Sequence, residues 1–254
     1  MKKITAALVL GVLLSACLGT KPRASLPAPE AASATTAAPE LLKLYDASRS
    51  REVPVALYRP ATRKKPVGLA LLSHGYGGQY TDYSFIAQAL AAEGYLVASV
   101  QHELPGDAPL ATTGTVYQAR MPSWQRGVQN LLFVRQQLQG WEPALQKAPL
   151  LLVGHSHGGD ISMLLAQQQP ALVDKVISLD NRRVPFPRAS RPRVLGLRSS
   201  DQQADPGVLP TPAEQQQHGT IVVTLAGQLH NDMYDGASAA QKAEMLRHIQ
   251  AFVK

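Results

Sequence analysis

The sequence has little cysteine, few aromatic residues and little charge. One Cys among 254 residues excludes an intrachain disulfide framework and a zinc site built from several cysteines. Aromatic residues make up 6% of the chain and charged residues 17%, against 45% hydrophobic residues, 19 Gly and 19 Pro. That composition excludes a collagen, a coiled coil, a polytopic membrane protein and a wholly disordered chain. The length suits one globular domain with some additional sequence.

The charge is unbalanced toward the basic side. The formal net charge is +7, which allows contact with anionic surfaces. However, no basic run is interleaved with aromatic residues, and no nucleic-acid-binding motif is present. We therefore expect a solvated basic surface and no nucleic-acid partner.

The N-terminus has the features of an export signal. Lys2 and Lys3 precede an apolar run over residues 4–14, which at eleven residues is too short to span a bilayer. The following Leu-Ser-Ala-Cys segment ends at Cys17 and resembles the bacterial lipobox. The pattern predicts a signal peptide over residues 1–16, lipidation of Cys17 and anchoring of the protein in the bacterial cell envelope, at the outer membrane or the periplasmic face. The alternative is a signal peptide cleaved nearby with an incidental Cys.

A low-complexity segment separates this signal from the rest of the chain. Residues 18–40 are rich in Ala, Pro, Ser and Thr and have few apolar anchors. With Cys17 they predict a disordered tether over residues 17–40. The folded domain is expected over residues 41–254.

Beyond the tether, short apolar runs alternate with helical patterns. This rhythm predicts an α/β fold: a mostly parallel sheet of about seven or eight strands flanked by helices. The expected strands are 53–58, 67–73, 95–100, 150–154, 175–179, 193–197 and 220–225, and the expected helices are 81–93, 123–139, 157–169 and 238–253. A long loop is expected over residues 101–122. Twelve residues separate Asp180 from Arg193, which is too few for a large cap domain there.

A candidate nucleophile follows the expected strand 150–154. Residues 154–158 read Gly-His-Ser-His-Gly, a G-x-S-x-G elbow with a strand before it and a helix after it. Glycines at both ends allow a strained turn that exposes the Ser156 hydroxyl at the strand end. The alternative is a tight turn without chemistry.

A serine nucleophile needs a base and an orienting acid. His230 follows the last expected strand, whereas His218 precedes that strand and His248 lies within the final helix. We therefore expect His230 to be the base. Three carboxylates are candidate acids: Asp180 ends the strand 175–179, and Asp201 and Asp205 follow the strand 193–197.

A second glycine-rich turn follows the strand 67–73. The run Ser-His-Gly-Tyr-Gly-Gly over residues 73–78 is of the type that supplies one amide to an oxyanion hole. The expected donors are the amides of Tyr76 and His157. His74 and His155 are expected to support the loop and the elbow. We expect no cofactor and no metal, since the histidines lack zinc-like spacing.

With these residues assigned, the chain resembles an α/β hydrolase of the platelet-activating-factor acetylhydrolase-like group, related to dienelactone hydrolases and cutinase-like polyesterases. The resemblance spans residues 45–253 and includes the SHGYGG and GHSHGG motifs, the Leu-Asp at the end of the strand 175–179, and His230. It implies an α/β-hydrolase fold. In the acetylhydrolases the triad acid matches Asp180, whereas dienelactone-like relatives have it nearer Asp201 or Asp205. A Ser in place of the dienelactone hydrolases' Cys nucleophile argues against that activity.

The expected function is therefore a serine hydrolase that cleaves carboxylic esters through an acyl-enzyme. The expected partners are a small-molecule or lipid ester as substrate and a membrane, contacted through the N-terminal lipid. Narrower alternatives are a phospholipid acyl hydrolase and a peptidase. A non-catalytic surface lipoprotein with a hydrolase fold is the alternative from another class. Six arginines between residues 182 and 198 are either solvated loop charges or a contact for anionic lipid.

Overall fold

The computed structural model describes residue 1, residues 38–60 and residues 65–254. The predicted signal peptide and the lipidation site Cys17 lie outside the described residues, as does most of the predicted tether. Within the part of the chain that is described, no helix has the length and apolarity needed to cross a membrane.

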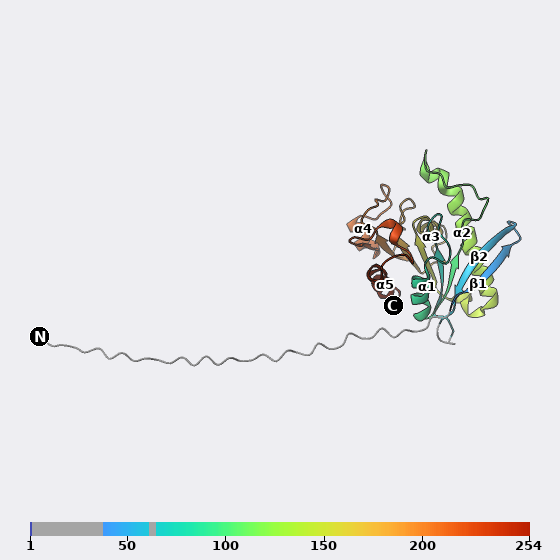
Figure 1. Cartoon of the computed structure of the whole chain (residues 1–254), viewed down its shortest axis with the longest axis horizontal. Helices are drawn as coiled ribbons and strands as arrows, with labels where there is room; N and C mark the ends of the chain where they lie inside the picture. Colours follow the sequence, from blue (N-terminus) through green and yellow to red (C-terminus); the bar gives the residue numbers. More distant parts are fainter. Residues whose placement is uncertain (2–37, 61–64) are drawn as a thin grey trace. The chain divides into compact units, whose positions relative to one another are not determined.

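An eight-stranded sheet forms the centre of the domain (Figure 1). Its strands are β1 (Glu40–Asp46), β2 (Arg51–Tyr58), β3 (Gly68–Ser73), β4 (Tyr95–Val100), β5 (Leu150–His155), β6 (Lys175–Leu179), β7 (Arg193–Arg198) and β8 (Ile221–Thr224). They lie in the order β1-β2-β4-β3-β5-β6-β7-β8. The β1–β2 and β2–β4 pairs are antiparallel, and the other five pairs are parallel. The predicted mostly parallel sheet is confirmed.

Helices cover both faces of this sheet. They are α1 (Ser84–Ala92), α2 (Val116–Trp141), α3 (His157–Gln168), α4 (Pro212–His218) and α5 (Ala239–Val253), with short 3-10 turns η1 (Pro143–Lys147) and η2 (His230–Asp232). The core on one face includes side chains of α2 and α3, and that on the other includes side chains of α1 and α5. Consecutive β3 residues contribute to opposite cores, with Leu71 on the first and Leu72 on the second. A strand buried on both faces has to be apolar throughout, as this one is.

The structure corrects one predicted boundary. Helix α2 begins at Val116, so the predicted loop 101–122 ends at residue 115 and Pro122 lies inside the helix. A proline inside a helix removes one backbone hydrogen bond. A prediction from sequence therefore places the start of the helix after Pro122. Two contacts offset that loss. Within the helix, Tyr117 packs edge-on against Trp124 with ring centroids 5.3 Å apart, and Met121 makes a tertiary contact with the core.

Two short elements were not predicted. The edge strand β1 pairs with β2 from Glu40 to Asp46, and it exposes two of its large side chains, Leu41 and Tyr45. Helix α4 buries no residue and begins with a capping box between Thr211 and Glu214. Neither element carries a strong apolar pattern. Between β6 and β7 the described chain has no helix, so no large cap covers that edge of the sheet.

Candidate active site

Ser156 occupies a strained turn between β5 and α3. It has φ +51°, a left-handed value that favours glycine, and its amide donates to the Leu179 carbonyl at 2.8 Å. The flanking glycines leave no room for side chains. A Cβ at Gly154 would lie 2.2 Å from the Gly158 carbonyl oxygen, and one at Gly158 would lie 2.3 Å from the Ser73 carbonyl oxygen. The close backbone contacts that hold Ser156 at the end of β5 therefore require glycine at both positions.

His230 links the serine to a carboxylate. It follows β8 and opens the turn η2. The Ser156 hydroxyl lies 2.9 Å from His230 Nε2, and His230 Nδ1 lies 2.5 Å from Asp180 Oδ2. Asp180 comes directly after β6 and is fully buried. Three segments far apart in the sequence thus form one continuous hydrogen-bonded line.

The other two candidate acids do not contact the imidazole ring of His230 by hydrogen bonds. Asp201 Oδ1 instead accepts the His230 backbone amide at 2.8 Å. Asp205 pairs with Arg183, whose Nη1 lies 2.7 Å from Asp205 Oδ2. Of the three candidate acids, only Asp180, the residue preferred from the sequence, contacts the ring, and the geometry does not support the alternatives Asp201 and Asp205. The catalytic role of Asp180 stays a prediction.

Asp180 is held by several donors besides His230. Ser199 donates from its hydroxyl at 2.7 Å and from its amide at 3.1 Å, and Arg198 Nη2 lies 2.8 Å from Asp180 Oδ1. Burial raises the pKa of Asp180, but the hydrogen bond from His230, the charge of Arg198 and the Ser199 hydrogen bonds together lower it below its ordinary value. The buried carboxylate is therefore ionised.

His155 supports the base from behind. Its Nε2 lies 3.0 Å from the His230 carbonyl oxygen, and its Nδ1 lies 2.7 Å from the Tyr83 hydroxyl. Burial lowers the pKa of His155 to about 3, so the ring is neutral and donates to the carbonyl. The same Tyr83 hydroxyl accepts the Gly75 amide at 3.0 Å. One neutral network thus ties His230 to the glycine-rich loop after β3.

The two predicted oxyanion donors lie on neighbouring elements. Tyr76 is in the loop after β3, and His157 is the first residue of α3, with their ring centroids 6.1 Å apart. The Tyr76 hydroxyl accepts the Leu110 amide at 3.0 Å, which joins the loop after β4 to this corner of the site. The role of the two amides stays a prediction.

A buried carboxyl lies next to the site and was not singled out from the sequence. Glu103 Oε1 is 3.4 Å from His157 Nε2, and Glu103 Oε2 is 3.5 Å from His74 Nδ1. The Trp124 indole donates to His157 Nδ1 at 3.1 Å, so the remaining nitrogen of His157 carries the proton. Burial raises the pKa of Glu103 to about 7. Its position directly after His102, at the end of an apolar strand, was the only sequence signal.

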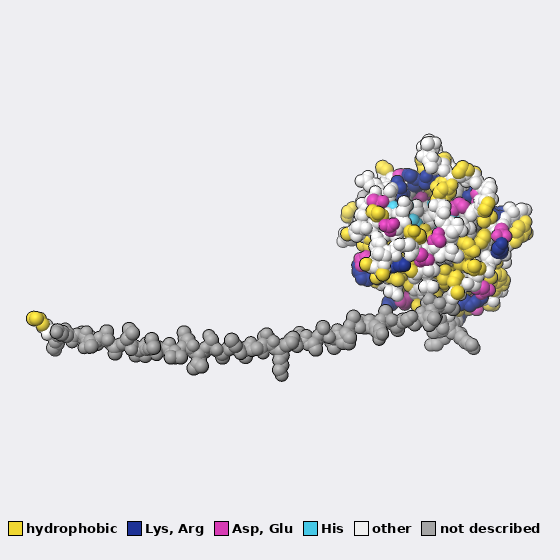
Figure 2. Space-filling view, viewed as in Figure 1, with side chains coloured by type: hydrophobic (Ala, Val, Ile, Leu, Met, Phe, Trp, Pro, Cys, Tyr) yellow, Lys and Arg dark blue, Asp and Glu magenta, His cyan; other side chains and the backbone are white. Residues whose placement is uncertain are grey.

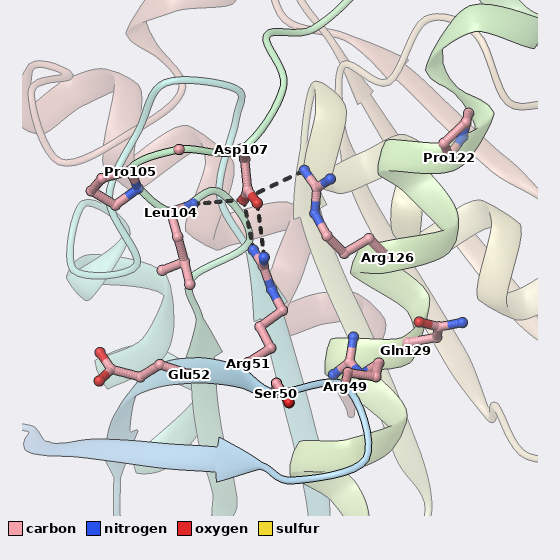
Figure 3. Close-up of a pocket in the computed structure, with 11 residues that line it drawn as sticks. Arg49, Ser50, Arg51, Glu52, Leu104, Pro105, Asp107, Pro122, Arg126 and Gln129 are labelled. Atoms are coloured by element: carbon pink, nitrogen blue, oxygen red, sulfur yellow. Dashed lines mark hydrogen bonds and ion pairs between the residues drawn. The ribbon is translucent and has the colours of Figure 1, made fainter.

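The loop that carries Glu103 is fastened by ion pairs (Figure 3). Arg51 contacts both oxygens of Asp107 at 2.8 and 2.7 Å, and Arg126 approaches the same carboxylate at 3.6 Å. The Leu104 amide also donates to it, at 2.8 Å. These groups line an open cavity of about 580 Å³. Asp107 lies between the guanidinium groups of Arg51 and Arg126. These ion pairs fix the loop that places Glu103 next to His157.

Most histidine side chains are buried, and on the face shown in Figure 2 histidine atoms reach the surface in small patches only. Among the described residues, no group of three or more His, Cys, Asp or Glu side chains has the arrangement of a metal site. Most of the arginines between residues 182 and 198 have partners within the fold: Asp205 for Arg183, Glu214 for Arg188, Asp174 for Arg191, the Phe252 ring for Arg193 and Asp180 for Arg198. These contacts favour a structural role for the arginine run.

Sequence comparison matches the segment that carries the elbow. Residues 64–179 match the family described as Serine aminopeptidase, S33. A segment of 108 residues is 33% identical to the sn-1-specific diacylglycerol lipase ABHD11 of Mus musculus and covers 42% of this chain. That segment spans only 30% of the length of the mouse protein.

Solved structures match over most of the domain. An alpha-beta serine hydrolase homologue from Coxiella burnetii has a TM-score of 0.55 at 18% identity, covering 82% of this chain and 96% of that one. Est1E from Butyrivibrio proteoclasticus has 0.58 at 12% identity, covering 85% and 98%. Esterase 2 from Thermogutta terrifontis has 0.59 at 13% identity, covering 86% and 94%. The chain has the α/β-hydrolase fold.

The sequence matches cover less than half of the chain, and they show similarity to serine hydrolases in the broad sense. The narrower resemblance to platelet-activating-factor acetylhydrolases and dienelactone hydrolases stays a prediction.

Proposed function

We propose that the protein is a serine hydrolase that cleaves carboxylic esters through an acyl-enzyme intermediate. The observation that supports this most is the line from the Ser156 hydroxyl through His230 to Asp180, with contacts of 2.9 and 2.5 Å. A neutral serine is a weak nucleophile, and an adjacent imidazole oriented by a carboxylate is the arrangement that activates it.

In the proposed first step, Ser156 Oγ attacks the ester carbonyl while His230 Nε2 takes the hydroxyl proton. Asp180 orients the ring and stabilises the imidazolium. The Tyr76 and His157 amides donate to the oxyanion, and each such donor contributes about 3 kcal/mol to transition-state stabilisation. The alcohol leaves with the proton from His230. Water then attacks the acyl-enzyme, with His230 again acting as base, and releases the acid.

The proposed substrate is a small or lipid-derived ester. No cap lies between β6 and β7, and Tyr76 at the site is 48% exposed, which suits substrates that enter from solvent. The mouse relative is named a diacylglycerol lipase, and structures of the Thermogutta esterase hold propionate and butyrate. The matched family description supports a second candidate substrate, the amide bond of a peptide.

We also propose that the enzyme is tethered to the bacterial envelope through lipid on Cys17. This proposal rests on Lys2, Lys3, the apolar run 4–14 and the lipobox-like end at Cys17. Several acyl chains on one cysteine would anchor the domain stably, where a single chain holds weakly. Cys17→Ser should move the protein from the membrane fraction to the soluble fraction and abolish incorporation of labelled palmitate.

The decisive test is hydrolysis of chromogenic esters of increasing acyl length by the wild-type protein and by Ser156→Ala. We expect turnover by the wild type and a loss of at least about a thousandfold in the variant. Aminoacyl and peptide chromogens tested in parallel distinguish the esterase from the peptidase. Equal rates in both proteins, with no covalent labelling by a fluorophosphonate, would identify a non-catalytic protein with this fold.

A further inference from the structure

A buried guanidinium lies on the side of Asp180 away from the base. Arg198 Nη2 is 2.8 Å from Asp180 Oδ1, with the two side chains 5% and 0% exposed. Its Nη1 donates to the Asn181 carbonyl at 2.6 Å. Arg198 is the last residue of β7, and the Asp180 amide donates to the preceding residue's carbonyl, that of Leu197, at 2.8 Å. The acid and the arginine are thus held by adjacent strand ends.

The carboxylate has four donors, two on each oxygen. Oδ2 accepts from His230 and from the Ser199 hydroxyl. Oδ1 accepts from the Ser199 amide and from Arg198. Of these donors Arg198 alone is a permanent cation, because guanidinium stays protonated in proteins. The negative charge that faces the base is therefore shared with a positive charge on the opposite oxygen.

Sharing this charge has a definite consequence for the base. A full carboxylate charge stabilises the imidazolium form of a neighbouring histidine, and a cation beyond the carboxylate opposes that stabilisation. A cation at this place therefore favours the neutral ring, which is the form that activates the serine, over the imidazolium. The same cation keeps Asp180 ionised in a site where burial favours its neutral form.

We propose that Arg198 is a positioning residue that acts through Asp180 and extends the activity of the enzyme to lower pH. The inference rests on the proposed function of Ser156, His230 and Asp180. Arg198 touches neither the substrate site nor the reacting atoms in this arrangement. Its effect is on the charge and the position of the acid.

Other charged groups surround this cluster. Those facing His230 are Asp180, His155 and Asp201, and those acting on Arg198 besides Asp180 are Arg182 and Asp160. His155 is neutral, since burial lowers its pKa to about 3. Desolvation raises the pKa of Asp201, but hydrogen bonds led by the His230 amide outweigh it and keep this carboxylate ionised. Burial raises the pKa of Asp160 to about 6, so Asp160→Asn is needed as a control for a second titration in the same range.

The experiment measures the second-order rate constant of fluorophosphonate labelling against pH for the full-length protein. Labelling reports the activated serine without knowledge of the natural substrate. In Arg198→Met and Arg198→Gln we expect the acidic limb of the profile to move up by about one pH unit, which makes labelling about tenfold slower at the acidic end relative to each variant's own plateau.

Two variants separate this effect from a merely structural one. Arg198→Lys keeps the charge, so its acidic limb should stay at the wild-type position even if the plateau falls. Ser199→Ala removes an uncharged donor from the same carboxylate, and it should lower the thermal midpoint and the plateau without moving the limb.

The outcomes are distinguishable. An unmoved limb in a folded Arg198→Met or Arg198→Gln overturns the inference while leaving the proposed function intact. If neither neutral variant folds, Arg198→Lys decides: a limb at the wild-type position supports the inference, and a limb moved by about one pH unit despite the retained charge overturns it. Absence of labelling of the wild type at every pH overturns the proposed function and this inference with it.

Discussion

His155 and His230 lie ring to ring behind the nucleophile, with centroids 4.9 Å apart and His155 Nε2 3.0 Å from the His230 carbonyl oxygen. The Tyr83 hydroxyl lies on the other side of His155, 2.7 Å from Nδ1. The base is therefore held through its backbone by a neutral histidine from β5 as well as through its ring by Asp180.

Replacing His155 by Leu should weaken both folding and catalysis. The substitution leaves the His230 carbonyl and the Tyr83 hydroxyl without their partner, which costs about 1–3 kcal/mol of unfolding free energy. We expect ester hydrolysis to fall about tenfold, because a loosely held base samples the reactive geometry less often. Urea unfolding and kcat measure the two effects. His218→Ala, at the end of α4, is the control and should change neither. A wild-type rate in the His155 variant would contradict this role.

The three candidate acids should separate by function. Asp180→Asn should lower kcat by about 10⁴-fold, since the amide favours the wrong tautomer of the base. Asp201→Asn replaces the charged acceptor of the His230 backbone amide by a neutral one, which weakens this hydrogen bond by about 1 kcal/mol and should cost at most about tenfold. Asp205 pairs with Arg183 away from the ring, so Asp205→Asn should retain near-wild-type turnover. Steady-state kinetics on one chromogenic ester compares all three. A large loss in Asp205→Asn with an intact Asp180→Asn would refute the assignment.

Glu103 should make stability depend on pH. Its ordinary pKa is 4.5, and burial raises the pKa in the folded protein to about 7. Between these values the folded protein holds a proton that the unfolded chain has released, so stability falls as the pH rises through this window. Glu103→Gln removes the titration. Its unfolding free energy relative to wild type should increase from about pH 5 to about pH 8 in urea titrations.

The control for that measurement is an exposed carboxylate with the opposite shift. Hydrogen bonding at the α4 cap, led by the Thr211 amide, lowers the pKa of Glu214. Its stabilisation is present above the ordinary pKa, so Glu214→Gln should differ from wild type by a similar amount at both pH values. A pH-independent difference for Glu103→Gln would show that its carboxyl is not held neutral by burial.

The glycines of the elbow offer a test of the turn itself. An alanine Cβ at Gly154 would lie 2.2 Å from a backbone oxygen, so Gly154→Ala should lose about 3 kcal/mol of unfolding free energy and most of the activity. At Gly140, near the end of α2, a Cβ meets no atom within 4 Å. Gly140→Ala should therefore raise stability by about 0.5–1 kcal/mol through helix propensity. Thermal and urea unfolding compare the pair, and a well-folded, active Gly154→Ala would contradict the steric account.

Local patterns predicted the parts of the fold that depend on local physics. The apolar run that forms β3 had to be a strand buried on both faces, and its bounds differ from the prediction by one residue. The elbow was recognised from its residue pattern, and one of its close contacts, between Gly154 and Gly158, is local, whereas Gly158 also approaches the Ser73 carbonyl of another strand. The start of α2 was missed because Pro122 indicates a helix start, whereas the packing of Met121 against the core is a tertiary contact that no local rule shows.

Local sequence patterns did not show which of the three candidate carboxylates contacts His230. Asp180, Asp201 and Asp205 all follow strands that end at the same edge of the sheet, and each position is compatible with a local pattern. Glu103 had only a weak sequence signal for a related reason: its contacts are with His74, after β3, and His157, after β5. A site whose residues come from several strands has no characteristic residue spacing within any one segment of the sequence.

By itself the sequence determined that the domain is an alternating α/β structure with a serine on a strand-to-helix turn, since apolar periodicity and the G-x-S-x-G pattern relate residues that are near neighbours in the chain. Only the tertiary structure decided which carboxylate contacts His230, that Arg198 contacts the other oxygen of that carboxylate, and that the partly buried Glu103 lies beside the elbow. These relationships depend on how strand ends from distant segments converge at one edge of the sheet, and side-chain distances there follow from the packing of the whole fold.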